Sequence, residues 1–176
     1  YYPSGSLFSD GTFLYGMTEY GGANNLGTIF KIKPDGTWYS KLLDFSGIAN
    51  WAFPFRSSLI SDGTFLYGMT NDGGANNIGT IFKIKSDGTG YSKLHDFSGT
   101  NGDGGVGSLI SDGTFLYGMT GSGGTGGNCG PSGDCGVIFK IKPDGTSYTV
   151  LHHFSGLDGK YPRGSLFYDG TFLYGM

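Results

Sequence analysis

A motif of eight residues, Asp-Gly-Thr-Phe-Leu-Tyr-Gly-Met, occurs four times along this chain of 176 residues. Its copies begin at Asp10, Asp62, Asp112 and Asp169, so successive copies lie 52, 50 and 57 residues apart. A period near 50 residues is typical of propellers and solenoids, in which each unit buries its apolar surface against its neighbours. The repeat therefore organises the whole chain into units that depend on one another.

Each complete unit carries two further landmarks, which divide it into four short strands. Phe-Lys-Ile-Lys begins at Phe30, Phe82 and Phe139, and Phe-Ser-Gly begins at Phe45, Phe97 and Phe154. Asp-Gly pairs stand between the apolar runs, and they tolerate the backbone angles of a tight hairpin turn. In the second unit the runs predict antiparallel strands over 58–61, 65–70, 80–85 and 91–97.

The composition favours an all-β fold. The 14 Phe, 12 Tyr and 2 Trp residues supply apolar surface that offsets the entropy of ordering 36 glycines. Helix formers are scarce, since Glu19 is the only glutamate and glutamine does not occur. Eleven basic and 14 acidic residues give a net charge of −3, which leaves no basic footprint for nucleic acid or for a membrane surface. No apolar run reaches the length of about 18 residues that a membrane span needs.

Each unit predicts a four-stranded sheet with apolar residues on both faces, which must stack on its neighbours. We therefore expect an all-β propeller of four-stranded antiparallel blades, with a linear β-solenoid as the alternative. The chain forms one repeat array, 1–176, with complete blades over about 5–47, 57–99 and 107–156 and half a blade over about 164–176. Propellers have about 4 to 8 blades, so closing a ring requires further chain or association of copies. A start without Met and a stop inside a strand favour further chain.

The unit Gly-Ser-Leu … Asp-Gly-Thr-Phe-Leu-Tyr-Gly-Met-Thr … Gly-Thr-Ile-Phe-Lys-Ile-Lys-Pro-Asp-Gly-Thr … Asp-Phe-Ser-Gly resembles the GloVer (Gloeo/Verruco) repeat of bacterial secreted and surface-anchored proteins. It is more distantly similar to the kelch repeat. The resemblance covers essentially the whole chain and implies a propeller-like array in an extracellular protein, without implying a common activity. The departures are a cysteine-bearing insertion in the third unit and a second link in which Gly104-Gly105-Val106 replaces an aromatic-proline pair.

The two cysteines, Cys129 and Cys135, bracket a Gly- and Pro-rich insertion in the third unit. At the ends of such a loop they can approach closely enough for a disulfide, which would restrict the entropy of the loop. We expect this bridge, and with it an oxidising compartment. A metal site would need more thiolate or imidazole ligands than these two, and the spacing in redox-active pairs is usually shorter.

The carboxylates and histidines have structural explanations. Every repeated aspartate precedes a glycine, and an aspartate in such a turn bonds its own backbone. His95 and His152 occupy the same position of successive units, so they and His153 are not expected to converge on a metal. Loops rich in oxygen donors, such as 101–103, lack the spacing of an EF-hand. We expect no catalytic residue, no metal site and no cofactor in this segment.

Residues that occur in one unit alone are the better candidates for binding. The first link is two residues longer than its counterpart and brings together Trp51, Phe53, Phe55 and Arg56. An aromatic ring there can stack on a sugar or insert into a partner, with Arg56 as a polar anchor. The alternative is that Phe53 and Phe55 fill the seam between blades, which leaves Trp51 as the residue expected to be exposed.

Four glycines occupy the centre of the same strand in successive units: Gly16, Gly68, Gly118 and Gly175. Glycine weakens a strand interior, so its recurrence predicts a close approach. We expect the neighbour of Gly68 to be a large side chain such as Tyr67 or Met69 of the adjacent blade's opposite face. Gly175 should tolerate substitution better, because its blade is incomplete.

The leading functional hypothesis is a non-enzymatic extracellular or cell-surface propeller that acts as a structural, adhesive or protein-binding scaffold. A carbohydrate-binding propeller is the alternative, and an enzyme with catalytic residues outside this segment is a third class. The expected partners are further repeats of a longer chain or copies of the chain itself, with glycans or other surface proteins as candidate ligands. We expect neither nucleic-acid binding nor membrane insertion of this segment.

Overall fold

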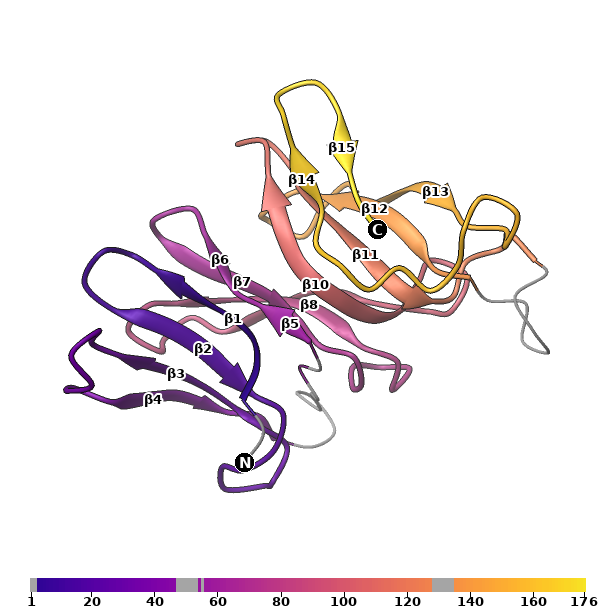
Figure 1. The fold of residues 1–176 in the computed structure, drawn as a ribbon. Coiled ribbons are helices and arrows are strands. Elements are labelled where there is room, and N and C mark those ends of the chain that lie inside the picture. The colour runs from indigo at the N-terminus through magenta and orange to yellow at the C-terminus, as the bar shows by residue number, and fades with distance from the viewer. Residues whose placement is uncertain (1–2, 47–53, 55, 128–134) are drawn as a thin grey trace.

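The computed structural model describes residues 3–46, 54, 56–127 and 135–176. These residues form fifteen strands and, within that part of the chain, no helix. Figure 1 shows three sheets in chain order, each packed against the next, followed by a short hairpin. The predictions of an all-β chain and of four-stranded antiparallel sheets are confirmed. The described residues accordingly contain no helix that could cross a membrane.

We call the three sheets blades 1 to 3 and the final hairpin the half-blade. Blade 1 consists of β1 (Pro3–Ser9), β2 (Leu14–Thr18), β3 (Thr28–Ile32) and β4 (Ser40–Asp44). Blade 2 consists of β6 (Ile60–Ser61), β7 (Phe65–Met69), β8 (Thr80–Lys85) and β9 (Ser92–Asp96). Blade 3 consists of β10 (Asp103–Ser111), β11 (Leu116–Ser122), β12 (Val137–Ile141) and β13 (Thr149–His153). The half-blade pairs β14 (Phe167–Tyr168) with β15 (Leu173–Tyr174), and β5 (Ser57–Ser58) runs parallel to β10.

The repeated Asp-Gly-Thr-Phe segment forms the hairpin turn between the first and second strands. In blade 2, Asp62 Oδ1 accepts hydrogen bonds from the backbone N–H groups of Thr64 and Phe65, both at 2.8 Å. Asp62 Oδ2 accepts a third from the Tyr67 hydroxyl at 2.7 Å. Gly63 takes a φ of 91°, so the glycine supplies the conformation and the aspartate stabilises it. The same three bonds recur at Asp10, Asp112 and Asp169.

The two largest clusters of the hydrophobic core lie in the seams between blades. In seam 1, between blades 1 and 2, Phe45 packs edge-on against Phe82, with ring centroids 5.8 Å apart. In seam 2, between blades 2 and 3, Phe97 packs in the same way against Phe139 at 5.7 Å. All four rings are fully buried, and aromatic pairs in this geometry stabilise beyond their buried area. Each blade therefore depends on its neighbour for its core.

The first strands of successive units lie side by side at the centre of the array. β5, which begins the second unit, contacts β1 and pairs with β10. The backbone N–H of Ser6 donates to Ser58 Oγ at 2.7 Å, and that of Ser108 donates to Ser165 Oγ at 2.9 Å. Equivalent residues thus connect successive units, and Arg56, Val106 and Arg163, which precede the leucines of these strands, line one pocket.

The crowding at the strand-centre glycines has a different cause from the predicted one. A Cβ atom on Gly68 would lie 2.6 Å from Cζ of Phe82, which stands opposite it in the β7–β8 register. The close neighbour is therefore a ring of the same blade, and the expectation of Tyr67 or Met69 from the adjacent blade is wrong. Strand alternation indicates which face a residue occupies, but not which side chain leans across it. Gly16 and Gly118 face Phe30 and Phe139 in the same way.

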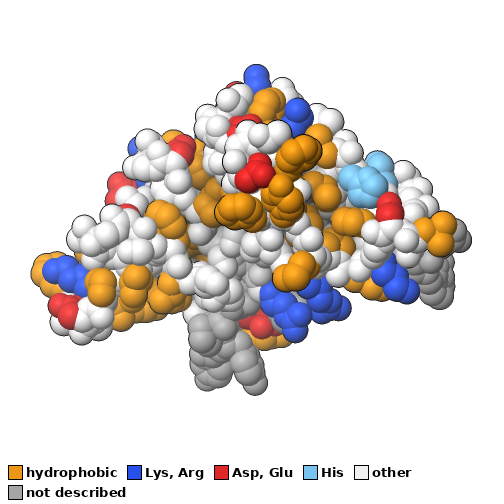
Figure 2. Space-filling view, turned by 45° about the horizontal axis from the view of Figure 1, so that its top comes forward, with side chains coloured by type: hydrophobic (Ala, Val, Ile, Leu, Met, Phe, Trp, Pro, Cys, Tyr) orange, Lys and Arg blue, Asp and Glu red, His pale blue; other side chains and the backbone are white. Residues whose placement is uncertain are grey.

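The half-blade covers part of blade 3 and leaves apolar side chains exposed. Leu166 is buried in a cluster with Met119 and Val106 of blade 3, whereas Phe172 is 63% exposed and Met176 is 94% exposed. Figure 2, in which the top of the molecule comes forward, shows hydrophobic side chains gathered on this face. The array therefore has an open apolar side at the half-blade.

Candidate functional site

A pocket of about 280 Å³ is lined in part by residues that precede the first-strand leucines of three successive units. Two of its lining residues, Arg56 and Arg163, lie in links, directly before β5 and shortly before β14 respectively. Tyr161 belongs to the same link as Arg163, and the other lining residues lie in or beside β7, β10 and β11. We call this site the arginine pocket; it is lined by Arg56, Asn71, Val106, Gly121, Ser122, Tyr161 and Arg163.

The repeat explains why the two arginines line one pocket. They are the only arginines of the sequence, and each stands three residues before the leucine of a first strand, Leu59 or Leu166. Val106 holds the same position before Leu109. Because the first strands lie side by side, residues that enter them from successive links converge on one place. The fold thus assembles a single site from residues far apart in the sequence.

The arginine pocket concentrates positive charge on an acidic chain. Both arginines are exposed, none of the lining residues is acidic, and the chain as a whole carries a net charge of −3. A guanidinium group presents its donors in a planar fork that binds a carboxylate through two parallel hydrogen bonds. Asn71, Ser122 and Tyr161 place neutral polar groups beside this charge. The pocket is suited to a ligand that carries a carboxylate.

Two lining residues adopt a backbone conformation that is unusual for residues with side chains. Arg56 has a φ of 55° and Tyr161 a φ of 54°, both in the left-handed region. Such conformations cost about 1–3 kcal/mol and persist where the surroundings hold them. The backbone N–H of Gly107 donates to the carbonyl oxygen of Arg56 at 3.1 Å, which anchors the arginine to β10.

Residues 1–176 match the Gloeobacter/Verrucomicrobia repeat. The chain belongs to the Gloeobacter/Verrucomicrobia repeat family. This confirms the resemblance to the GloVer repeat that the motifs indicate. No curated protein sequence matches the chain.

Several solved structures share the fold of this Gloeobacter/Verrucomicrobia repeat chain. A chain of the nidogen/laminin complex matches with a TM-score of 0.63 at 18% identity, over 94% of this chain and 51% of that one. A putative TolB from Agrobacterium tumefaciens gives 0.57 at 14% identity, over 92% and 52%. The GH74 enzyme of Niastella koreensis gives 0.51 at 21% identity, over 81% and 20%. The fold is therefore propeller-like rather than a linear solenoid, and the chain spans about half the length of the first two structures.

The arginine pocket contains one of the four residues predicted to bind a ligand, Arg56. Trp51, Phe53 and Phe55 lie outside the described residues, so their role stays a prediction. The sequence reasoning missed Arg163 and the other members of the pocket. The sequence did contain a signal for Arg163, because its two arginines share one repeat position. That both line one pocket, however, depends on how the first strands converge.

The other candidate residues of the repeat chain are dispersed. Cys135 is buried just before β12, and Cys129 lies outside the described residues, so the bridge between them stays a prediction. His95 lies against blade 3, whereas His152 Nε2 lies 2.9 Å from Asp158 Oδ2 on the surface. Among the residues that the structure describes, no three His, Cys, Asp or Glu side chains are placed to hold a metal ion.

Proposed function

We propose that this chain is part of a non-enzymatic, extracellular propeller scaffold that binds a partner protein through the arginine pocket. The observation that carries the proposal is the convergence of Arg56 and Arg163, from equivalent positions in two links, on a pocket with no acidic lining residue. The partner presents an acidic side chain, whose carboxylate pairs with the guanidinium groups. The blades provide a rigid support, and the links provide recognition.

The bonding of the repeated aspartates supports a non-catalytic role. Backbone N–H groups, foremost that of Phe115, hold the pKa of Asp112 below its usual value, and Phe172 acts in the same way on Asp169. A carboxylate held ionised by its own turn is a poor proton donor or acceptor near neutral pH. The fold itself is shared with enzymes such as the GH74 enzyme, so this argument rests on the residues rather than on the fold.

Two features support an extracellular or cell-surface location. The GloVer repeat, which the motifs resemble, occurs in bacterial secreted and surface-anchored proteins. The sequence also places both of its cysteines at the ends of one short loop, where a disulfide would form in an oxidising compartment.

A carbohydrate-binding propeller is the second candidate, and Tyr161 favours it. This residue is 41% exposed and lines the pocket together with the arginines. A uronic-acid sugar would place its carboxylate on a guanidinium group and its ring face on the tyrosine. The third candidate is an enzyme whose catalytic residues lie outside residues 1–176.

Binding arrays distinguish these candidates. The chain is applied to an array of acidic and neutral peptides and to an array of neutral and uronic-acid glycans. We expect saturable binding to acidic peptides that weakens with salt and is lost in the Arg56→Ala/Arg163→Ala variant, together with flat signals across the glycans. The matched control, Lys85→Ala/Lys142→Ala, removes the same charge near the turns at the other end of the blades and should bind as the unmodified chain does.

Saturable glycan binding that is lost in Tyr161→Ala or Trp51→Ala would instead establish that the chain is a carbohydrate-binding propeller. Peptide binding that survives removal of both arginines would refute the proposed site.

A further inference from the structure

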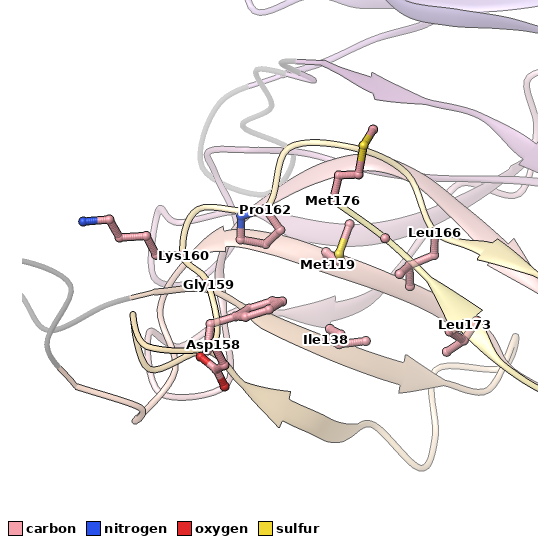
Figure 3. A pocket seen from close by; sticks show the side chains of 11 residues that line it. Met119, Ile138, Asp158, Gly159, Lys160, Pro162, Leu166, Leu173 and Met176 are labelled. Atoms are coloured by element: carbon pink, nitrogen blue, oxygen red, sulfur yellow. The ribbon is translucent and has the colours of Figure 1, made fainter.

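A second pocket, of about 320 Å³, lies between blade 3 and the half-blade. Figure 3 shows that side chains of both parts line the pocket, among them Met119 and Ile138 of blade 3 and Leu166 and Leu173 of the half-blade. Phe154, the phenylalanine of the third Phe-Ser-Gly segment, also lines it. We call this place the seam pocket.

The seam pocket is built from the same repeat positions as the closed seams. Met119, Ile138, Phe154, Leu166 and Leu173 correspond to Met17, Ile29, Phe45, Leu59 and Leu66, all five of which belong to the seam 1 cluster. Seam 2 uses the same positions again, with Met69, Ile81, Phe97, Leu109 and Leu116. Both closed seams also contain a phenylalanine and an isoleucine from the third strand of the following blade, Phe82 and Ile84 in seam 1 and Phe139 and Ile141 in seam 2. Among the described residues that line the seam pocket, none is a counterpart of this third-strand phenylalanine and isoleucine.

Gly175 marks the place of the missing ring. In each complete blade the strand-centre glycine stands opposite the phenylalanine of the third strand, and a Cβ on Gly16, Gly68 or Gly118 would lie within 2.7 Å of that ring. At Gly175 the nearest atoms to such a Cβ are Leu166 Cδ2 at 3.0 Å and Met119 Sδ at 3.5 Å. Gly175 has no positive φ that would require glycine. Its lack of a side chain leaves room for a ring.

The neighbouring strand has a free edge. β15 pairs with β14 along one edge, and no strand among the described residues pairs along the other. In blades 1 to 3 the corresponding edge of the second strand bonds the third strand of the same blade. An unpaired edge beside an apolar pocket is the arrangement that accepts an added strand.

We propose that the seam pocket receives the third strand of a further repeat of this family, an extended segment with the pattern Ile-Phe-Lys-Ile. The segment adds antiparallel to β15, and its phenylalanine covers Gly175 and packs against Phe154. A folded second copy does not fit this role, because β3, β8 and β12 are each bonded on both edges and their phenylalanines already cover a glycine. The proposal concerns a surface separate from the arginine pocket and does not depend on it.

The experiment combines the full chain with a synthetic peptide of residues 79–99, which contains the third and fourth strands of blade 2. Titration calorimetry measures affinity and stoichiometry, and amide NMR of residues 173–176 reports the place of binding. We expect saturable one-to-one binding with shifts at these amides. The Gly175→Ala chain and the Phe82→Ala peptide should each bind at least tenfold more weakly, because a Cβ or the loss of the ring removes the same contact.

Two matched controls complete the test. Gly164→Ala makes the same change in the same half-blade, where the nearest atom to the added carbon, the carbonyl oxygen of Met176, lies 3.8 Å away. Lys83→Ala removes a peptide side chain of the opposite strand face. Both should bind as the unmodified partners do. If Gly175→Ala fails to fold, the affinities of the Phe82→Ala and Lys83→Ala peptides for the unmodified chain are enough to test the proposal.

Three results would overturn the proposal. The first is no saturable peptide binding, and the second is an affinity indifferent to Gly175→Ala and to Phe82→Ala. The third is that no peptide binds while the chain associates with itself, and that Gly175→Ala abolishes this self-association. A second copy of the chain would then be the occupant of the seam pocket.

Discussion

Gly68 shows how one missing side chain permits the packing of a blade. The ring of Phe82 lies across it and reaches Phe45 of the previous blade, so the glycine allows the contact on which seam 1 depends. The sequence alone predicts that something large approaches this position, because a strand gains nothing from glycine otherwise. It does not identify Phe82, because the tilt of a side chain across a strand depends on the packing of the neighbouring blade.

Replacing Gly68 by valine should therefore destabilise the fold, although an ordinary strand position accepts valine well. We expect a loss of about 1–3 kcal/mol in the free energy of unfolding, because the branched side chain must displace the ring of Phe82. Gly118→Val should cost a similar amount against Phe139. Denaturant unfolding monitored by circular dichroism measures both.

Gly175→Val is the control for this series, since the three atoms nearest to an added Cβ belong to Leu166 and Met119 and not to a phenylalanine ring. It should cost clearly less than Gly68→Val. Equal stability of Gly68→Val and the unmodified chain would refute the close-packing account of the second strand.

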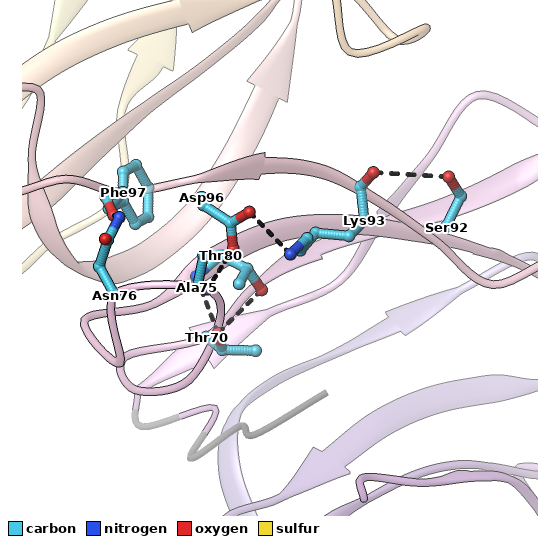
Figure 4. A network of polar contacts seen from close by, with 8 residues as sticks. All are labelled: Thr70, Ala75, Asn76, Thr80, Ser92, Lys93, Asp96 and Phe97. Atoms are coloured by element: carbon cyan, nitrogen blue, oxygen red, sulfur yellow. Dashed lines mark hydrogen bonds and ion pairs between the residues drawn. The ribbon is translucent and has the colours of Figure 1, made fainter. Parts of the chain in front are cut away.

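Among the secondary-structure elements, the loop between the second and third strands is tied to the fourth strand by one repeated acceptor. Figure 4 shows this network in blade 2, where Asp96 Oδ1 accepts from the backbone N–H of Ala75 at 2.8 Å and Lys93 Nζ pairs with Asp96 Oδ2 at 2.7 Å. In blade 3, His153 takes the position of the aspartate, and its Nδ1 accepts from the backbone N–H of Thr125 at 3.1 Å. The third unit thus keeps the bond while it changes the residue.

We expect the contact that His95 makes between β9 and blade 3 to depend on pH. Its ring stacks on Tyr148 with centroids 3.7 Å apart, and its Nε2 lies 3.1 Å from the amide nitrogen of Asn101. Burial lowers the pKa of His95 below its ordinary value of 6.5, although Asp96 and Asn101 act in the opposite direction. The unfolded chain therefore takes up the proton first as the pH falls.

The free energy of unfolding should accordingly be highest above pH 6.5 and decrease as the pH falls through that value, levelling off below the lowered pKa. The variant His95→Leu, which carries the residue found at the equivalent Leu43, should lose this part of the pH dependence. Denaturant titrations between pH 7.5 and about pH 5 measure the slope. His152→Leu, at an exposed position, is the control, and the same slope in both variants would contradict the role of His95.

The inserted loop of the third unit carries the predicted disulfide. Mass spectrometry of a non-reduced digest should find Cys129 joined to Cys135, and reduction should loosen the loop while it leaves the cooperative unfolding of the blades largely unchanged. Two free thiols in protein from its native compartment would refute both the bridge and the extracellular location.

The elements differ in how far the sequence predicts them. The hairpins follow from local chemistry, since Asp62, Gly63 and Thr64 form the turn with their own atoms. Two features do not follow from local chemistry: the parallel pairing of β5 with β10 and the placement of Arg56 and Arg163 at one pocket. Both depend on the convergence of units that are remote in the sequence. The pocket was therefore only partly predictable, through the unusual composition of one link.

At the scale of the whole molecule, the repeat array has two open sides. Blade 1 exposes 53% of Leu7 and 72% of Trp38, and the half-blade exposes Phe172, Tyr174 and Met176. The corresponding faces between blades are closed by the next repeat. Apolar surface and free strand edges of this kind favour association.

We therefore predict that the chain 1–176, expressed by itself, is not a stable monomer. Sedimentation velocity should show species that grow with protein concentration, and the peptide of residues 79–99 should reduce this association without abolishing it, since it covers one of the two open sides. A compact monomer that melts cooperatively at all concentrations would contradict the prediction.

The equivalence of the seams also bears on how such a chain changes during evolution. Loss of residues 58–107 would join Ser57 to Ser108 and bring blade 3 against blade 1, with Phe139 taking the position of Phe82 beside Phe45. Each residue at the new junction would then contact a residue that holds the same repeat position as the neighbour it lost. A recombination event that adds or removes a whole repeat therefore preserves the packing, whereas one that cuts within a repeat separates a glycine from its phenylalanine. Selection on the seams leaves the number of repeats free to vary in steps of one.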